Sequence, residues 1–224
     1  MTCKNDVLDI LSIDIDYCQS EQDLREVVCL FTRSLLYFRD LREAGQEIIN
    51  FSFSQTHADI ASVLKGYPKI NVYNIDNHHD IYYDPVNLLE IEDGVVEENN
   101  WVGWLFRSQL IERYHWIKNS NSELLSKEDV LGLQSRFGVS FSDGFLYSGK
   151  RNADYSKEGM HKSFNPISYY NSIDDVEINF SRLAEVFVCM SPEYLKKEFH
   201  YLYFLLIDLA SNILGRESIN IFNP

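Results

Sequence analysis

Short apolar runs alternate along this chain with segments of helical periodicity. The apolar runs predict strands at residues 7–15, 47–53, 69–75, 114–117 and 185–190. The helical segments cover residues 21–43, 58–64, 100–111, 124–137 and 191–214. Because strands that alternate with helices are typical of an α/β domain, we predict a three-layer αβα fold around a largely parallel sheet.

Two segments interrupt this alternation. Residues 81–98 are acidic and are expected to form a loop. Residues 138–172 are rich in Gly, Ser, Asn, Tyr and Phe and show little periodicity. So long an irregular segment in a compact domain is more often a functional loop or hairpin than a linker. We therefore predict one domain over residues 1–224, with a loop or hairpin insertion at about residues 138–172.

Composition narrows the range of partners. The chain has 224 residues, 45% of them hydrophobic, and a formal net charge of −14. Such a surface repels phosphates, which argues against nucleic acid, and it would attract a cationic substrate. The longest apolar stretch is far too short to span a bilayer, so no membrane partner is expected. The four cysteines form no CxxC pair, which favours free thiols in a reducing cytoplasm.

Potential metal ligands follow three of the predicted strands. Asp76, His78 and Asp80 stand at alternate positions, and an extended backbone projects such residues to one side. Asp14 and Asp16 show the same alternation, and His57 follows a third strand. The carboxyl ends of parallel strands meet at one edge of a sheet, where ligands usually bind.

Four carboxylates and two imidazoles suit Mn²⁺ and are enough for two ions. Each residue also has an ordinary structural interpretation. An Asp that follows a strand is often only the N-cap of the next helix, and a single His is more often structural than a ligand. The complete D-x-H-x-D spacing, combined with D-x-D at the end of another strand, favours the metal centre.

These residues carry a family resemblance. Asp76-Asn77-His78-His79-Asp80 resembles the D-A-H-x-D motif of the ureohydrolases, the arginase and agmatinase superfamily, and residues 12–16 resemble their S-x-D-x-D motif. Asn100-Trp101 resembles an Asn-Trp pair in the divergent peptide arginase branch. In ordinary arginases the S-x-D-x-D strand follows D-A-H-x-D, whereas here it comes first. The resemblance therefore implies an arginase-like fold with a permuted motif order.

The resemblance implies a two-manganese hydrolase that converts arginine in a ribosomally made precursor peptide to ornithine and releases urea. The implied metal ligands are Asp14, Asp16, His57, Asp76, His78 and Asp80. Asp16 and Asp76 are the implied bridging ligands, and Asp80 is the implied acceptor of the nucleophile's proton.

Four residues are predicted to bind the substrate. Glu193 resembles the glutamate that binds the guanidinium group, although Ser191-Pro192-Glu193 is also an ordinary start of a helix. For a peptide substrate we expect contacts from Asn100, Trp101 and His161. The general acid stays open among the histidines His79, His115 and His161.

Two other classes of function remain in view. A DHH-type phosphoesterase has D-x-D before Asp-His-His and matches the motif order, but here Asn77 separates Asp76 from His78. A haloacid-dehalogenase-like phosphatase would have Thr or Val where this chain has Cys18, and it leaves residues 76–80 unexplained. A non-enzymatic acidic binding module would use the same carboxylates only as solvated helix caps.

Overall fold

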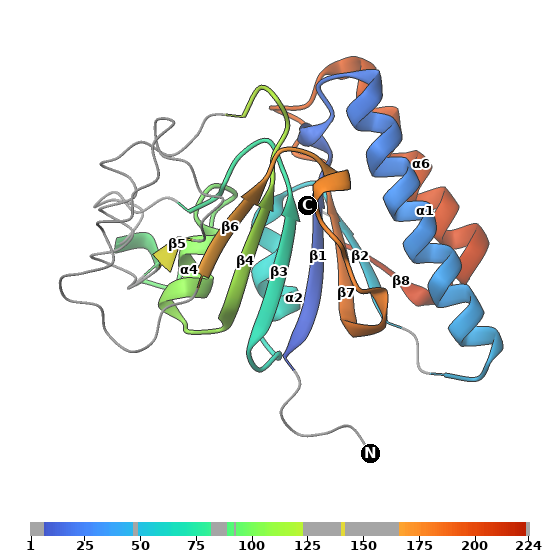
Figure 1. Ribbon diagram of the computed structural model, residues 1–224, viewed down its shortest axis with the longest axis horizontal. Coiled ribbons are helices and arrows are strands. Elements are labelled where there is room, and N and C mark those ends of the chain that lie inside the picture. The colour runs from blue at the N-terminus through green and yellow to red at the C-terminus, as the bar shows by residue number, and fades with distance from the viewer. Residues whose placement is uncertain are drawn as a thin grey trace.

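The computed structural model describes residues 7–46, 49–81, 89–91, 93–122, 140–141 and 166–222. Within these residues eight strands form one sheet in the order β5-β6-β4-β3-β1-β7-β2-β8, and every pairing is parallel (Figure 1). The strands are β1 (Leu8–Asp14), β2 (Asn50–Ser54), β3 (Ile70–Ile75), β4 (Ile111–Ile117), β5 (Ser140–Phe141), β6 (Pro166–Tyr170), β7 (Leu183–Cys189) and β8 (Ile219–Ile221).

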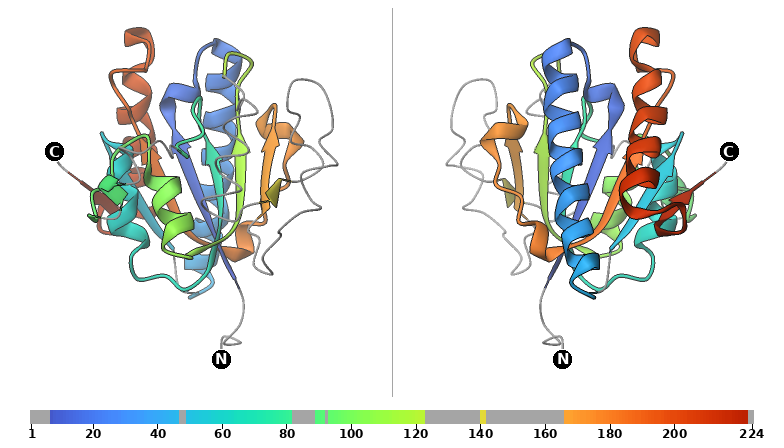
Figure 2. Two further views of the ribbon diagram at one scale, coloured as in Figure 1. Left: turned by 90° about the vertical axis from the view of Figure 1, so that its left-hand side faces the viewer. Right: turned by 90° about the vertical axis from the view of Figure 1, so that its right-hand side faces the viewer.

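Helices cover both faces of this sheet. The long helices α1 (Glu21–Glu43) and α6 (Tyr201–Leu214) pack together on one face, as the two side views show (Figure 2). The shorter helices α2 (Ile60–Leu64) and α4 (Trp101–Arg107) lie on the other face (Figure 1). Each face has its own apolar cluster against the sheet. The predicted three-layer αβα fold with a parallel sheet is confirmed.

The connections place one particular edge of the sheet for ligand binding. From β1 the chain crosses through α1 on one face to β2, toward one edge of the sheet, whereas from the neighbouring strand β3 it crosses through α4 on the other face to β4, toward the opposite edge. Connections that leave neighbouring strands in opposite directions open a crevice at the carboxyl ends of those strands. These ends of β1 and β3 lie toward the top of Figure 1.

The longest helix has the bounds that its sequence pattern predicts. Ser20 is its N-cap, with the side chain accepting a hydrogen bond of 3.2 Å from the Asp23 backbone N–H. Glu21 and Asp23 place negative charge in the first turn, where it is attracted to the positive end of the helix dipole. Gly45 follows the last turn at φ 73°, a conformation that glycine adopts without strain. Both ends are thus marked by local chemistry.

Several other predicted bounds are wrong. The helix expected from residue 191 begins only at Tyr201, and the strand expected to be the last is followed by β8. Helix α4 ends at Arg107, and Ile111, which we placed in that helix, begins β4. In the segment expected to be irregular, Pro166–Tyr170 is the strand β6, which pairs in parallel with β4 and β5.

Two predictions concern segments that the structure does not describe. The helix predicted at residues 124–137 and the middle of the predicted insertion, residues 142–165, lie outside the described residues. Among the helices that the structure describes, none has both the length and the apolar character that crossing a bilayer requires.

Candidate metal centre

All six predicted metal ligands converge at the carboxyl end of the central strands. Asp14 ends β1 and Asp16 lies in the 3-10 turn Ile15–Tyr17 that follows it. His57 begins the 3-10 turn His57–Asp59, two residues after β2. Asp76, His78 and Asp80 lie directly beyond β3, which pairs with β1. Five of the six side chains are buried and His78 is partly exposed, with 39% of its side chain accessible.

Asp76 stands between two groups of donor atoms. One group joins Asp16, Asp76 and His78, the other joins His57, Asp76 and Asp80, and within each group the potential ligand atoms lie within 4.8 Å of one another. Asp76 Oδ1 lies 3.9 Å from His78 Nδ1, and Asp76 Oδ2 lies 3.4 Å from His57 Nδ1. A carboxylate with one oxygen toward each group has the placement of a bridging ligand. Asp16, the other predicted bridge, belongs to only one of these groups.

Backbone amides fix the orientation of three of these carboxylates. The His78 N–H donates to Asp76 Oδ1 at 2.7 Å, and the Asn77 N–H donates to Asp16 Oδ1 at 3.2 Å. The Asp16 N–H donates to Asp14 Oδ1 at 3.1 Å. These are the local turns that Asp residues commonly make after a strand. None of these three backbone hydrogen bonds uses the second oxygen, Oδ2, of its carboxylate.

The ring of His57 presents Nδ1 to the acidic residues. Nδ1 lies 3.1 Å from Asp14 Oδ2 and 3.3 Å from Asp80 Oδ2, while Nε2 lies 2.8 Å from Ser12 Oγ. The ring also stacks on Phe187, with 5.9 Å between centroids. A partner on the far nitrogen is how a ligating histidine is usually oriented. Ser12 on β1 therefore assigns Nδ1 as the atom that would bind a metal.

The structure adds residues that the sequence analysis missed. The Ser191 hydroxyl donates to Asp14 Oδ2 at 2.5 Å, and the Asn74 side chain donates to Asp76 Oδ2 at 3.0 Å. Cys189 also has its sulfur within 4.8 Å of ligand atoms of Asp14 and His57. Ser191 and Cys189 come from the end of β7, which pairs with β1. In the sequence, the only signal for these residues is that polar side chains follow the strand β7. We interpreted Ser191 as a helix cap.

Asn100 and Trp101, which we predicted to contact the substrate, lie in the interior of the described part of the protein. Both are fully buried at 0% exposure, and neither lines a pocket described below. The Trp101 indole N–H donates to Asp80 Oδ2 at 2.6 Å, and Asn100 Oδ1 accepts from the Glu97 backbone N–H at 2.9 Å. Trp101 thus positions a potential metal ligand, and Asn100 shapes the turn before α4.

The pKa values of three aspartates of this cluster, Asp16, Asp76 and Asp80, are raised. Burial, together with the charge of Asp14, raises the pKa of Asp16 to about 6. Burial, followed by the charge of Asp80, raises the pKa of Asp76 well above its ordinary value. Burial by itself would lower the pKa of His57, but its hydrogen bond to Asp14 and the surrounding negative charges outweigh this and raise it. For Asp16 and Asp76 burial is the largest cause and repulsion between neighbouring carboxylates adds to it; bound cations would relieve that repulsion.

The donors present fit divalent cations. Asp16 Oδ2 is buried and lies 2.9 Å from His78 Nδ1, yet it accepts no hydrogen bond of suitable geometry. A buried carboxylate oxygen without a donor calls for an explanation, and a metal ion supplies one. Four carboxylates and two imidazoles form an oxygen-rich set of the kind that Mn²⁺ accepts.

Two adjoining pockets open beside this cluster. The inner pocket, of about 110 Å³, is lined by Asp14, Asp16, His57, His78, Asp80, Glu98, Asn99, Ser191 and Tyr194. The outer pocket, of about 550 Å³, is lined by Thr56, Glu90, Glu97, Glu98, Asn99, Glu193 and Tyr194. Glu193, the predicted guanidinium ligand, is exposed and lines only the outer pocket. Glu98, which the sequence analysis did not single out, lines both.

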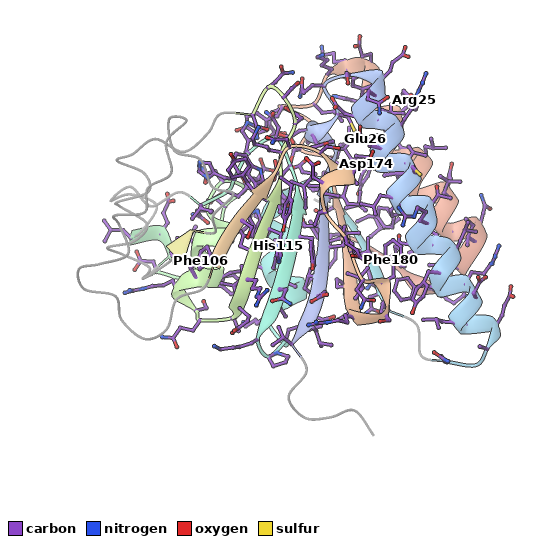
Figure 3. All side chains as sticks on the ribbon, viewed as in Figure 1. Arg25, Glu26, Phe106, His115, Asp174 and Phe180 are labelled. Atoms are coloured by element: carbon purple, nitrogen blue, oxygen red, sulfur yellow. The ribbon has the colours of Figure 1, made fainter. Side chains whose placement is uncertain are left out.

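Of the three histidines considered as general acid, the two that the structure describes, His79 and His115, line neither pocket. His115 lies part-way along β4, below the edge where β3 ends, and stacks on Tyr73 with 4.5 Å between centroids (Figure 3). Burial lowers the pKa of His115 to about 4. His79 Nδ1 accepts a hydrogen bond of 3.1 Å from the Ile81 backbone N–H. His161 lies outside the described residues.

Comparison of this chain with models of protein families, with curated proteins and with solved structures found no match. The functional interpretation therefore depends on the motifs and on the geometry of the cluster.

Proposed function

We propose that this protein is a two-manganese hydrolase that converts arginine in a peptide to ornithine and releases urea. The observation that supports this most is the position of Asp76, with one carboxylate oxygen toward each of two groups of donors. A single structural metal would need only one such group. The acidic pockets beside the cluster support a cationic substrate, and they disfavour phosphate.

In this proposal Asp14, Asp16, His57, Asp76, His78 and Asp80 hold the ions. The ions supply a water molecule that is deprotonated near neutral pH and stabilise negative charge that develops on the substrate. Water adds to the guanidinium carbon Cζ, the bond from Cζ to the arginine Nε breaks, and the products are urea and the ornithine ammonium group. The atoms balance with one water per arginine.

Asp80 is the proposed proton acceptor. Its carboxylate lines the inner pocket, and the Trp101 N–H holds Oδ2 at 2.6 Å. The proton that Asp80 takes from water can then pass to the departing nitrogen, which must gain one to leave as an amine. Burial raises the pKa of Asp80, although His57, Asp76 and Trp101 oppose this effect, and a raised pKa makes the carboxylate a stronger base.

The setting that we propose is the cytoplasm. The three described cysteines, Cys18, Cys29 and Cys189, are all free thiols, which is compatible with a reducing compartment.

The test combines a metal count with product analysis. Purified protein is loaded with Mn²⁺, the ions per chain are counted, and the protein is incubated with free arginine or with an arginine-bearing peptide. We expect two ions per chain, urea in solution, and a loss of about 42 Da per arginine on the peptide, as the stoichiometry requires. Turnover of free arginine alone would contradict a peptide substrate.

Matched variants connect these results to the centre. Asp76→Asn should lose both ions and all urea release, whereas Asp174→Asn, which changes an exposed carboxylate in another part of the molecule, should retain both (Figure 3). Hydrolysis of a phosphodiester without urea would favour the DHH-type phosphoesterase. Absence of stoichiometric metal at neutral pH would favour the acidic binding module.

A further inference from the structure

The inner and outer pockets share three residues, which mark the junction between them. These are Glu98, Asn99 and Tyr194. Glu98 lies just before α4, and Tyr194 lies in the segment after β7, so two distant parts of the chain form the junction. Any molecule that passes from the outer pocket to the metal ligands must pass these side chains. The junction is therefore where a substrate would be selected.

The charges at the junction favour a cation. Two divalent ions would carry four positive charges, which match the four aspartates at positions 14, 16, 76 and 80. The glutamates at positions 90, 97, 98 and 193 are left over, and the described residues that line the two pockets include no Lys or Arg. Their negative charge is then available to the substrate. Asp16 Oδ2, buried without a hydrogen bond, independently marks the inner pocket as a ligand site.

Glu98 differs from Glu193 in its surroundings. Glu98 is half-buried and interacts electrostatically with Asp14 and His57, whereas Glu193 is exposed. Burial raises the pKa of Glu98, a hydrogen bond with Thr56 opposes this, and the charge of Glu193 adds to the rise. A carboxylate partly removed from water binds a cation more strongly than an exposed one, because solvent screens it less.

Tyr194 provides the second half of a guanidinium site. Its ring is 56% exposed, lines both pockets and packs edge-on against His78, with 5.2 Å between centroids. A guanidinium group is planar, pairs with a carboxylate through two N–H groups and stacks on aromatic rings. A carboxylate and an exposed aromatic ring at one narrow junction match both preferences.

We propose that Glu98, rather than Glu193, is the carboxylate that selects the guanidinium group of the substrate, with Tyr194 as its stacking partner. This inference rests on the proposed function. It assigns Glu193 to the outer pocket, where it meets parts of the peptide farther from the reacting group.

The test compares Glu98→Gln with Glu193→Gln, and uses Glu177→Gln to control for the loss of one exposed carboxylate outside both pockets. Each manganese-loaded variant is assayed for urea release from an arginine-bearing peptide. Binding of that peptide and of its neutral citrulline counterpart is measured by calorimetry. We expect Glu98→Gln to raise KM at least about tenfold and to abolish the preference for arginine over citrulline, with two ions still bound. Glu193→Gln should raise KM less.

Each other outcome has a definite meaning. If Glu98→Gln loses an ion, Glu98 is a metal ligand and the inference is wrong. If Glu193→Gln has the larger effect, the guanidinium carboxylate is Glu193. If the wild-type protein releases no urea from any arginine substrate, the proposed function fails. The role of Glu98 is then decided by binding alone: a preference for arginine over citrulline that Glu98→Gln removes supports it, and any other result overturns it.

Discussion

The Ser191 hydroxyl donates a hydrogen bond of 2.5 Å to Asp14 Oδ2, and so connects the ends of the neighbouring strands β7 and β1. Ser191 has φ 40°, a backbone conformation that non-glycine residues seldom adopt. The unusual backbone brings its side chain to a carboxylate 177 positions away in the chain. Positioning of a metal ligand accounts for this contact.

Replacement of Ser191 should therefore weaken metal binding. In Ser191→Ala the Asp14 carboxylate loses the donor that orients it, and we expect the affinity for Mn²⁺ to fall by about 10–100-fold. Titration of the metal-free protein with Mn²⁺ measures this. Ser181→Ala, which removes an exposed hydroxyl bonded only to Asn179, is the control and should bind as the wild type does. Equal affinities for the two variants would contradict the role assigned to Ser191.

Trp101 should contribute to the centre through its N–H group. Trp101→Phe keeps an aromatic ring in the core but leaves Asp80 Oδ2 without its donor, which costs about 1–3 kcal/mol when a buried polar group is involved. We expect weaker Mn²⁺ binding and slower urea release. Trp104 lies in the same helix but is only partly buried. Trp104→Phe should therefore change the affinity for Mn²⁺ and the rate of urea release by less than about twofold. A normal turnover rate in Trp101→Phe would show that Asp80 needs no such support.

Metal binding should release protons and weaken as pH falls. Asp16 has its pKa raised to about 6, and the Asp16 carboxylate, 2.9 Å from His78 Nδ1, raises the pKa of His78, so both groups gain protons in the metal-free protein as pH falls. These protons must leave before the groups can bind a cation. Calorimetric titrations with Mn²⁺ in buffers of different ionisation enthalpy count the released protons. We expect more protons released at pH 6 than at pH 8; an affinity independent of pH would contradict this.

Glu185 should make the protein less stable as pH rises. Its carboxyl group is buried in β7 and receives a hydrogen bond of 2.6 Å from Ser52. Burial raises its pKa from 4.5 to about 7, so the folded protein binds a proton between these values that the unfolded chain has lost. The free energy of unfolding therefore falls as pH rises through this window, by about 3 kcal/mol in total.

Glu185→Gln removes the titrating group and retains an acceptor for Ser52. Chemical denaturation of metal-free protein from pH 4 to 8 gives the difference in unfolding free energy between wild type and variant. We expect the wild type to lose stability relative to Glu185→Gln as pH rises. Glu177→Gln, which changes an exposed carboxylate, should leave the pH profile unchanged. A constant difference for Glu185→Gln would mean that folding does not raise the pKa of Glu185.

The sequence predicts the layers of this fold well because their signals are local. Helix α1 carries its cap, its acidic first turn and its terminal glycine within the sequence itself. Strand β6 was missed because five residues with two tyrosines show no distinct alternation. Strand β8, at three residues, is shorter still. Their place in the sheet depends on pairing with β4 and β2, which no local pattern reports.

In the candidate centre, too, local motifs identify some residues, whereas others become visible only in the structure. Spacing within one motif was enough to find Asp76, His78 and Asp80, and a second motif supplied Asp14 and Asp16. Ser191, Glu98 and Tyr194 have no motif of their own, and they join the site only because strands and loops far apart in the chain come together. Trp101 was found by resemblance, but its burial, and hence its role, needed the structure.

The position of β7 has a consequence for how the centre assembles. Strand β7 lies between β1 and β2, although it follows both by more than a hundred residues. A ribosome-bound chain that ends before residue 183 already contains all six potential ligands, yet it lacks the strand that sets the spacing between Asp14 and His57. The six potential ligands can thus reach their final spacing only after residues 183–189 have been synthesised, so a metal ion held by all of them would bind after β7 has entered the sheet.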